Sequence, residues 1–207
     1  AVDDSWDITY APYTDGLDMD VFVKDGFTGA PFMTQVWPGP TYMPDWFHPN
    51  VTEYWSGSID TFWNTVPFDG LWTDMNEVSN FCNDGGTAQV CENSSPDTCP
   101  TGSVDTQTNC CLSCDTIDSS NLLDFPPYAI NSDNNHDNLG HKTMPMSAVH
   151  FDGENKIDEY NVHNLFGLME ARLTADSLET TRGGRRPFVL SRSTFPSHGA
   201  HAAHWTG

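Results

Sequence analysis

A short acidic segment that follows an apolar run offers the strongest chemistry in this sequence. Residues 69–77 read Asp-Gly-Leu-Trp-Thr-Asp-Met-Asn-Glu, so Leu71 and Trp72 favour a buried strand, and Asp74 and Glu77 come directly after it. Side chains at the C-terminal end of a barrel strand are rigidly held yet open to solvent, which is where barrel enzymes build their active sites. Asp74 is therefore the first candidate catalytic residue.

Alternating helix and strand patterns surround this segment. Apolar residues between 50 and 66 recur at every third or fourth position and predict a helix, and residues 68–73 follow as a strand. A second helix is predicted from 162 to about 181, and residues 186–192 predict a strand with another polar exit. This order predicts an α/β fold of the barrel type.

Two weaker patterns lie near the ends of the chain. Residues 21–36 predict a hairpin around the Gly-bearing turn 25–29, closed by residues 37–40. Residues 200–207 predict the entry to a further strand, so we expect the chain to be a piece of a longer protein.

The composition limits the classes of partner. The chain has 207 residues, 37% of them hydrophobic, which is enough for the core of one domain. Eight basic and 29 acidic residues give a net charge of −21, which argues against nucleic acid and anionic membranes as partners. No apolar run approaches the roughly 20 residues of a membrane span.

Six cysteines lie within residues 82–114 of a long segment, 78–158, that interrupts the helix and strand pattern. The surrounding sequence is polar, so three disulfides are the leading explanation of its order, with no pairing readable. A zinc site on Cys111 and Cys114 is the competing interpretation. Two sequons, at residues 50–52 and 93–95, together with these cysteines favour a secreted, lysosomal, vacuolar or cell-surface protein.

The segment Gly70 to Glu77 resembles the signature of glycoside hydrolase family 31. Four further blocks resemble the same family in the same order: Val36-Trp-Pro-Gly39, Phe125-Pro-Pro-Tyr128, residues 160–167 and residues 186–195. The resemblance implies that residues 1–207 are part of one catalytic (β/α)8 TIM barrel, cut at both ends, with the long cysteine-rich insertion placed after the nucleophile strand.

The resemblance also implies a reaction and its principal residue. Family members that act as α-glucosidases place their nucleophile at the position of Asp74. A retaining glycosidase needs a second carboxyl group as proton donor, about 5 Å away. The resemblance places that donor directly after the run His204-Trp-Thr-Gly207, so we expect the isolated chain to be inactive.

Other positions carry over from the resemblance one at a time. Trp37 and Trp72 correspond to aromatic residues of the glucose pocket, and Met75 to its wall. Arg192 corresponds to an arginine near the proton donor, and Trp205 to an aromatic residue just before it. Glu77 is expected to support the nucleophile region through hydrogen bonds.

The expected activity is the release of terminal α-linked glucose from maltose, malto-oligosaccharides or starch-like glucans, without a metal or organic cofactor. The alternatives are a catalytically silent carbohydrate-binding homologue, an α-xylosidase and an α-glucosyltransferase. Two departures from the family pattern, Val78 and Ala200, lie away from Asp74, and the second puts the preferred linkage or chain length in doubt.

Overall fold

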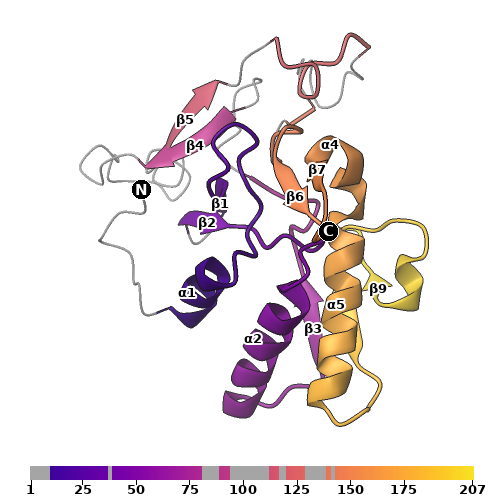
Figure 1. The fold of residues 1–207 in the computed structure, drawn as a ribbon. Coiled ribbons are helices and arrows are strands. Elements are labelled where there is room, and N and C mark those ends of the chain that lie inside the picture. Colours follow the sequence, from indigo (N-terminus) through magenta and orange to yellow (C-terminus); the bar gives the residue numbers. More distant parts are fainter. Residues whose placement is uncertain are drawn as a thin grey trace, which may run out of the picture.

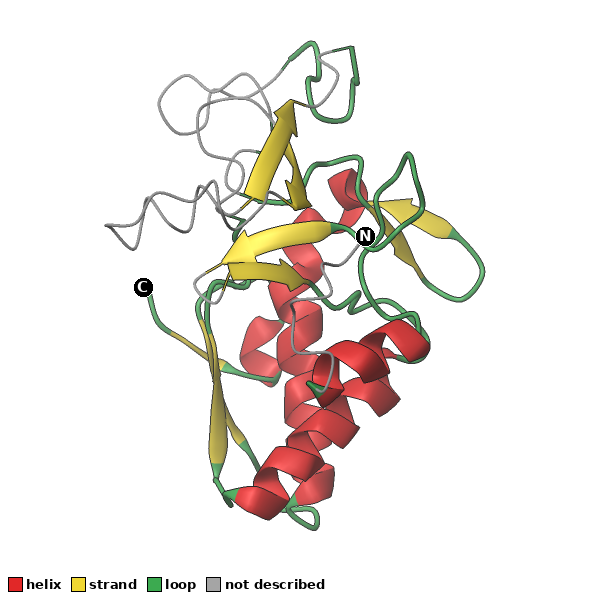
Figure 2. Cartoon of the chain, turned by 90° about the vertical axis from the view of Figure 1, so that its left-hand side faces the viewer, coloured by secondary structure: helices red, strands yellow, loops and turns green. Residues whose placement is uncertain are grey.

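Three short strands between residues 70 and 204 form a parallel sheet. The computed structural model describes residues 10–36, 39–80, 89–93, 112–116, 120–128, 139–140 and 143–207. Within these residues β3 (Gly70–Thr73), β8 (Phe188–Ser191) and β9 (Ala203–His204) pair in that order, and both pairings are parallel. The helices α2 (Val51–Thr65) and α5 (Phe166–Thr181) lie side by side on one face of the sheet (Figures 1 and 2). The strand, helix, strand order matches the α/β expectation.

The predicted helix over 50–66 is confirmed as α2. Its buried residues, Val51, Tyr54 and Ile59, share the face that packs against the core. Glu53 lies in the first turn, where a negative charge favours the helix dipole. The helix ends at Thr65 because Pro67 disfavours helical backbone at the residue before it.

The predicted helix over 162–181 exists, but it is divided into three pieces. The chain forms α4 (Glu159–Val162), the 3₁₀ turn η2 (His163–Leu165) and then α5. Val162 has backbone angles of −129° and 0°, outside the helical region, which separates the pieces. Gly183 and Gly184 follow the end of α5 with positive φ angles, as helix-terminating glycines do.

The strands β3 and β8 pack closely at Gly70. A Cβ atom at this position would lie 2.5 Å from the carbonyl oxygen of Phe188, so only glycine fits there. This contact sets the register that pairs Thr73 with Ser191 at the C-terminal end of the sheet. The side chains that follow these two strands therefore leave the sheet at the same edge.

The hairpin predicted over 21–36 is only partly correct. The chain does reverse at 25–29, with hydrogen bonds between Asp25 and Ala30 and between Phe32 and Val23, but residues 21–24 make isolated bridges instead of a strand. The regular hairpin is formed by β1 (Met33–Val36) and β2 (Gly39–Tyr42). The short helix α1 (Ala11–Asp18), which has Pro12 in its first turn, precedes it.

Two small antiparallel hairpins lie within residues 78–158. One pairs β4 (Gln89–Asn93) with β5 (Leu112–Thr116), and its register sets Cys91 opposite Cys114. The other pairs β6 (Val149–Phe151) with β7 (Lys156–Asp158). The other four cysteines, among them Cys111 of the expected zinc pair, lie outside the described residues, as does Ser95 of the second sequon.

A buried charged cluster fastens the β6–β7 hairpin to the rest of the molecule. His150 is fully buried, and its two ring nitrogens lie 2.7 Å from Asp45 and 2.6 Å from Glu159. Glu159 also pairs with His163 at 2.7 Å, and the second oxygen of Asp45 accepts the backbone N–H of Phe151. The cluster joins the loop after β2, the hairpin and α4.

The apolar core lies between the irregular segment before α2, the N-terminal parts of α2 and α5, and residues 144–148. Trp46 is 3% exposed and packs edge-on against Trp55 and Phe166, which joins α2 to α5. A hydrogen bond of 2.9 Å from Trp55 Nε1 to Thr174 Oγ1 adds to this contact. In the part of the chain that the structure describes, no helix has the length and apolar character to cross a bilayer.

Candidate active site

The turn after β3 presents Asp74 at the edge of the sheet. Asp74 accepts a hydrogen bond of 2.8 Å from the backbone N–H of Met75, and its side chain is 37% exposed. Met75 adopts a left-handed conformation with φ of +57°, which is rare for a methionine. Ser79 closes the turn by donating its N–H to the carbonyl oxygen of Met75. The sharp turn leaves the Asp74 carboxylate open to solvent.

Arg192 faces the two acidic side chains of this turn from the end of β8. Its Nε and Nη2 atoms donate to the two carboxylate oxygens of Glu77, at 2.7 and 2.8 Å. Its Nη1 atom lies 3.4 Å from Oδ1 of Asp74. The structure thus brings Asp74, Glu77 and Arg192 together, with the guanidinium group between the two carboxylates.

This arrangement determines the charge of Glu77. Partial burial alone would raise the pKa of Glu77, but the hydrogen bonds and the charge of Arg192 outweigh burial and hold the pKa below its ordinary value. The same hydrogen bonds raise the pKa of Arg192. A bidentate pair of this kind fixes the plane of the guanidinium group, which leaves Nη1 directed toward Asp74.

Asn76 ties together the two loops that carry these charges. It is 4% exposed, and its Nδ2 atom donates to Ser191 Oγ at 2.8 Å and to Thr73 Oγ1 at 3.3 Å. Its Oδ1 atom accepts the backbone N–H of Ser193 at 3.0 Å. We call these contacts the Asn76 bridge. Because they hold the residues on both sides of Arg192, they fix the backbone from which the guanidinium group extends.

Two indole rings lie beside the carboxylates. Trp72 is 63% exposed, and its ring centroid lies 5.3 Å from that of Trp205 at an angle of 64°. Exposed indoles are costly in water and suit the C–H faces of a sugar ring. The predicted pocket residues Trp72 and Trp205 are therefore in contact, whereas Trp37 lies outside the described residues.

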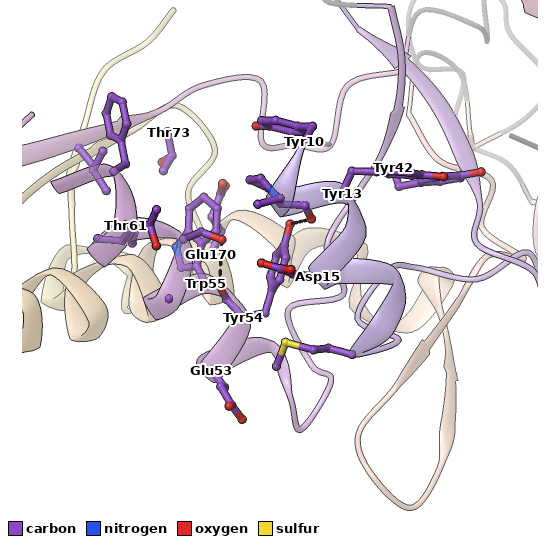
Figure 3. Close-up of a pocket in the computed structure, with 18 of the residues that line it drawn as sticks. Tyr10, Tyr13, Asp15, Tyr42, Glu53, Tyr54, Trp55, Thr61, Thr73 and Glu170 are labelled. Carbon is purple, nitrogen blue, oxygen red and sulfur yellow. Dashed lines mark hydrogen bonds between the residues drawn. The ribbon is translucent and has the colours of Figure 1, made fainter. Parts of the chain in front are cut away.

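A cavity of about 1300 Å³ adjoins the site, between β3 and the helices α1, α2 and α5 (Figure 3). Trp72, Thr73 and Asp74 line one side of the cavity. Four tyrosines line the opposite side: Tyr10, Tyr13, Tyr42 and Tyr54. Its charged lining residues are all acidic: Asp15, Glu53, Asp74 and Glu170. The site is thus a carboxylate next to an aromatic hollow.

Metal binding has little support in the described part of the chain. Among those residues, no three histidine, cysteine, aspartate or glutamate side chains converge as metal ligands would. Both nitrogens of the buried His150 are already engaged by carboxylates.

Sequence reasoning missed two residues of the site, Asn76 and Glu170. Asn76 is part of the segment 69–77, but its side chain has no signal of its own there. Glu170 did have a signal, because it follows Phe166 by four positions and precedes Leu173 by three, both of which are buried. An acid at that spacing lies on the buried face of a helix.

With the geometry established, similarity to known proteins identifies the family. All of residues 1–207 match the glycosyl hydrolases family 31 TIM-barrel domain, and the chain belongs to that family. The sequence is 42% identical to alpha-xylosidase 1 of Arabidopsis thaliana, over 96% of this chain and 20% of that protein. It is 40% identical to an alpha-glucosidase of Hordeum vulgare, over 99% of this chain and 19% of that protein.

A solved structure supports the fold. The ER glucosidase II heterodimeric complex, which consists of a catalytic subunit and the binding domain of a regulatory subunit, contains a similar chain, with a TM-score of 0.60 and 26% identity. The likeness covers 98% of this chain and 16% of that one. Lysosomal alpha-glucosidases of mammals are also among the relatives. The chain spans about a fifth of the length of the curated relatives it matches.

Proposed function

We propose that the protein containing this chain is a retaining α-glucosidase in which Asp74 is the nucleophile. The observation that supports this most is the position of Asp74: it follows a parallel strand, opens to the aromatic hollow and has Arg192 3.4 Å away. A carboxylate held in this way can attack an electrophilic carbon of a bound sugar. Family membership and the alpha-glucosidases among the relatives agree with this chemistry.

In the proposed reaction, a carboxylate oxygen of Asp74 forms a bond to the anomeric carbon of the terminal glucose. The bond from that carbon to the leaving oxygen breaks, and the leaving oxygen takes a proton from a second carboxyl group. Water then attacks the anomeric carbon of the glucosyl ester, returns a proton to the second group and frees Asp74. The net retention of configuration follows from the two displacements.

The neighbouring residues have supporting roles in this proposal. Glu77 holds Arg192 in place, and Arg192 keeps a positive charge beside Asp74, which orients the Asp74 carboxylate. Trp72 and Trp205 offer apolar faces to the sugar, Met75 forms part of the wall, and Trp37 is proposed as a further pocket residue on the strength of the resemblance alone. The proton donor is proposed to follow Gly207, again from the resemblance.

An α-xylosidase is the second candidate, because one of the most similar relatives is an alpha-xylosidase. Xylose lacks the hydroxymethyl group that glucose carries, so a pocket that accepts glucose needs additional room for that group. A pocket can reject a substrate that is too large far more strongly than one that lacks a methylene-sized group. Comparing p-nitrophenyl α-glucoside with p-nitrophenyl α-xyloside therefore separates the two activities.

The test uses the full-length protein with Asp74→Asn and a matched control, Asp176→Asn, which removes an exposed carboxylate from α5. We expect Asp74→Asn to lose roughly a thousandfold or more in kcat and Asp176→Asn to retain activity. Turnover of neither glycoside by a folded protein would favour a silent carbohydrate-binding homologue. Full activity of Asp74→Asn would refute the assignment of the nucleophile.

We further propose that the protein follows the secretory route to an extracellular, lysosomal, vacuolar or cell-surface location. The sequon at Asn50 supports this proposal, because Asn50 is exposed at the start of α2. Its Nδ2 atom donates to the carbonyl oxygen of Met19 at 3.0 Å, and a glycosylated amide keeps one N–H that can make this bond. Mass spectrometry of the peptide containing Asn50 from the native source tests it, and an unmodified Asn50 would remove this support.

A further inference from the structure

Glu170 is an acid that the proposed reaction does not use; the residue is partly exposed, but one of its carboxyl oxygens is enclosed. It lies in the second turn of α5, and its carboxyl group borders the cavity beside Thr73 and Trp55 (Figure 3). Its Oε2 atom is enclosed and has no hydrogen-bond partner among the described residues. A buried carboxyl oxygen without a partner is costly, so its presence next to the site calls for a function.

Glu170 lies against the Asn76 bridge. The Asn76 amide lies near the Glu170 carboxyl group and favours its ionised form, which lowers the pKa of Glu170. One turn earlier on the same helix, a Cβ atom at Gly167 would lie 2.9 Å from the carbonyl oxygen of Asn76 and 2.7 Å from Ser193 Cβ. The first turn of α5 therefore contacts Asn76 and Ser193 directly, and Glu170 lies one turn further along the same helix.

The surroundings of Glu170 disfavour its negative charge. Burial raises the pKa of Glu170 to about 7, the charge of Glu77 acts in the same direction, and the Asn76 hydrogen bond opposes both. The cation of the site, Arg192, is already paired with Glu77 and Asp74. The charged residues that line the cavity from α1 and α2, Asp15 and Glu53, are acidic as well. Ionised Glu170 would therefore stand as an uncompensated charge behind the nucleophile turn.

We propose that Glu170 is a positioning residue of the reaction, an inference that rests on the proposed function. Glu170 acts through the Asn76 bridge and keeps the Asp74 turn aligned with the Arg192 loop. The carboxyl group does this while it is uncharged. When it ionises, its charge attracts the Asn76 amide away from Ser191 and repels Glu77, and the two loops lose their alignment. The fully aligned form therefore exists at acidic pH and declines as the pH rises through about 7.

The test measures kcat and KM between pH 5 and 9 in the full-length protein, with α-glucosyl fluoride as substrate. Fluoride needs little protonation to leave, so the titration of the proton donor has less effect on the rate. With a pKa of about 7, Glu170 is roughly 90% ionised at pH 8, so we expect kcat to fall about tenfold between pH 6 and pH 8. KM should change little, because Glu170 acts on the nucleophile turn.

The variant Glu170→Gln keeps the shape of the side chain and removes its ionisation. We expect it to retain kcat within about threefold at pH 5 and to lose the alkaline fall. The matched control Glu179→Gln, an exposed position on the same helix, should keep the profile of the unmodified protein. A second variant, Asn76→Ser, removes the amide through which Glu170 acts, so its lower residual activity should also lose the alkaline fall. This variant also covers the case in which Glu170→Gln does not fold.

Two results would overturn the proposal: the same alkaline fall in Glu170→Gln as in the unmodified protein, or an equal loss of kcat at every pH. Trapping of Asp74 by a 5-fluoroglucosyl fluoride distinguishes this failure from that of the proposed function. Label on Asp74 with an unchanged alkaline fall in Glu170→Gln refutes only the role of Glu170. No label on Asp74 in the unmodified protein refutes both proposals.

Discussion

Replacement of His150 should lower the stability of the β6–β7 hairpin and remove its dependence on pH above neutrality. His150 is fully buried between Asp45 and Glu159, and His163 adds to the cluster from the other side of Glu159. Burial alone would lower the pKa of His150, but the two carboxylates outweigh burial and raise it to about 9. The imidazole is therefore an imidazolium ion in the folded protein at neutral pH.

The size and the sign of the effect follow from this pKa. A rise from 6.5 to about 9 corresponds to about 3 kcal/mol of stabilisation, at 1.36 kcal/mol for each pKa unit. This contribution is present in full below about pH 6.5, where histidine is protonated in both the folded and the unfolded chain. It is lost progressively as the pH rises to about 9. The lowered pKa of Glu159 acts at the other end, since its contribution is lost as the solution becomes strongly acidic.

Hydrogen exchange of the peptide spanning residues 147–163, in the full-length protein, measures this local stability directly. After correction for the intrinsic rate, we expect its protection to fall roughly a hundredfold between pH 6.5 and 9. His150→Gln should reduce protection at pH 6.5 by a similar factor and leave it nearly flat up to pH 9. His163→Gln removes only the outer member of the cluster and should keep most of the slope. An unchanged slope in His150→Gln would refute the reasoning.

Three further predictions concern the site and its supports. Glu77→Gln should lower kcat/KM about tenfold, because it weakens the charge-assisted hydrogen bonds that hold the partly exposed Arg192. Steady-state kinetics measure this change, and an unchanged kcat/KM would contradict the role of Glu77. Gly167→Ala should destabilise the full-length protein by about 1–3 kcal/mol, because its methyl group would collide with Ser193 and Asn76. Gly57→Ala, in open space on α2, should be neutral or slightly stabilising. Thermal inactivation compares the two variants. The six cysteines of the polar segment 82–114 predict three disulfides; peptide mapping without reduction tests this, and free thiols in the segment would contradict it.

The regular helices and the sheet strands were predictable because their signals are local. The spacing of Val51, Tyr54 and Ile59 gives the buried face of α2, and Pro67 marks its end. The division of the second helix was not predictable, since the apolar period continues through Val162 while the backbone there leaves the helical region. The lack of a regular strand at residues 21–24 was likewise not predictable, because Phe22 and Lys24 bridge to Pro44 and Val149, which are distant in sequence.

The site shows the same division between local and distant information. The order of residues 69–77 alone indicates an acidic strand end. The structure brings Asp74 and Glu77 together with Arg192, although Glu77 and Arg192 are 115 residues apart in the sequence. The Asn76 bridge depends on Ser191 and Ser193, and nothing in the local sequence of Asn76 indicates these partners. The raised pKa of Glu170 depends on burial by several elements, which no local pattern specifies.

The most direct test of the central claim is to locate the covalent intermediate. The full-length protein is treated with 5-fluoro-α-glucosyl fluoride, digested with a protease and sequenced by tandem mass spectrometry. We expect one 5-fluoroglucosyl label, on the carboxylate of Asp74. A label on any other residue, such as Glu77, or a folded and active protein that acquires no label, would contradict it.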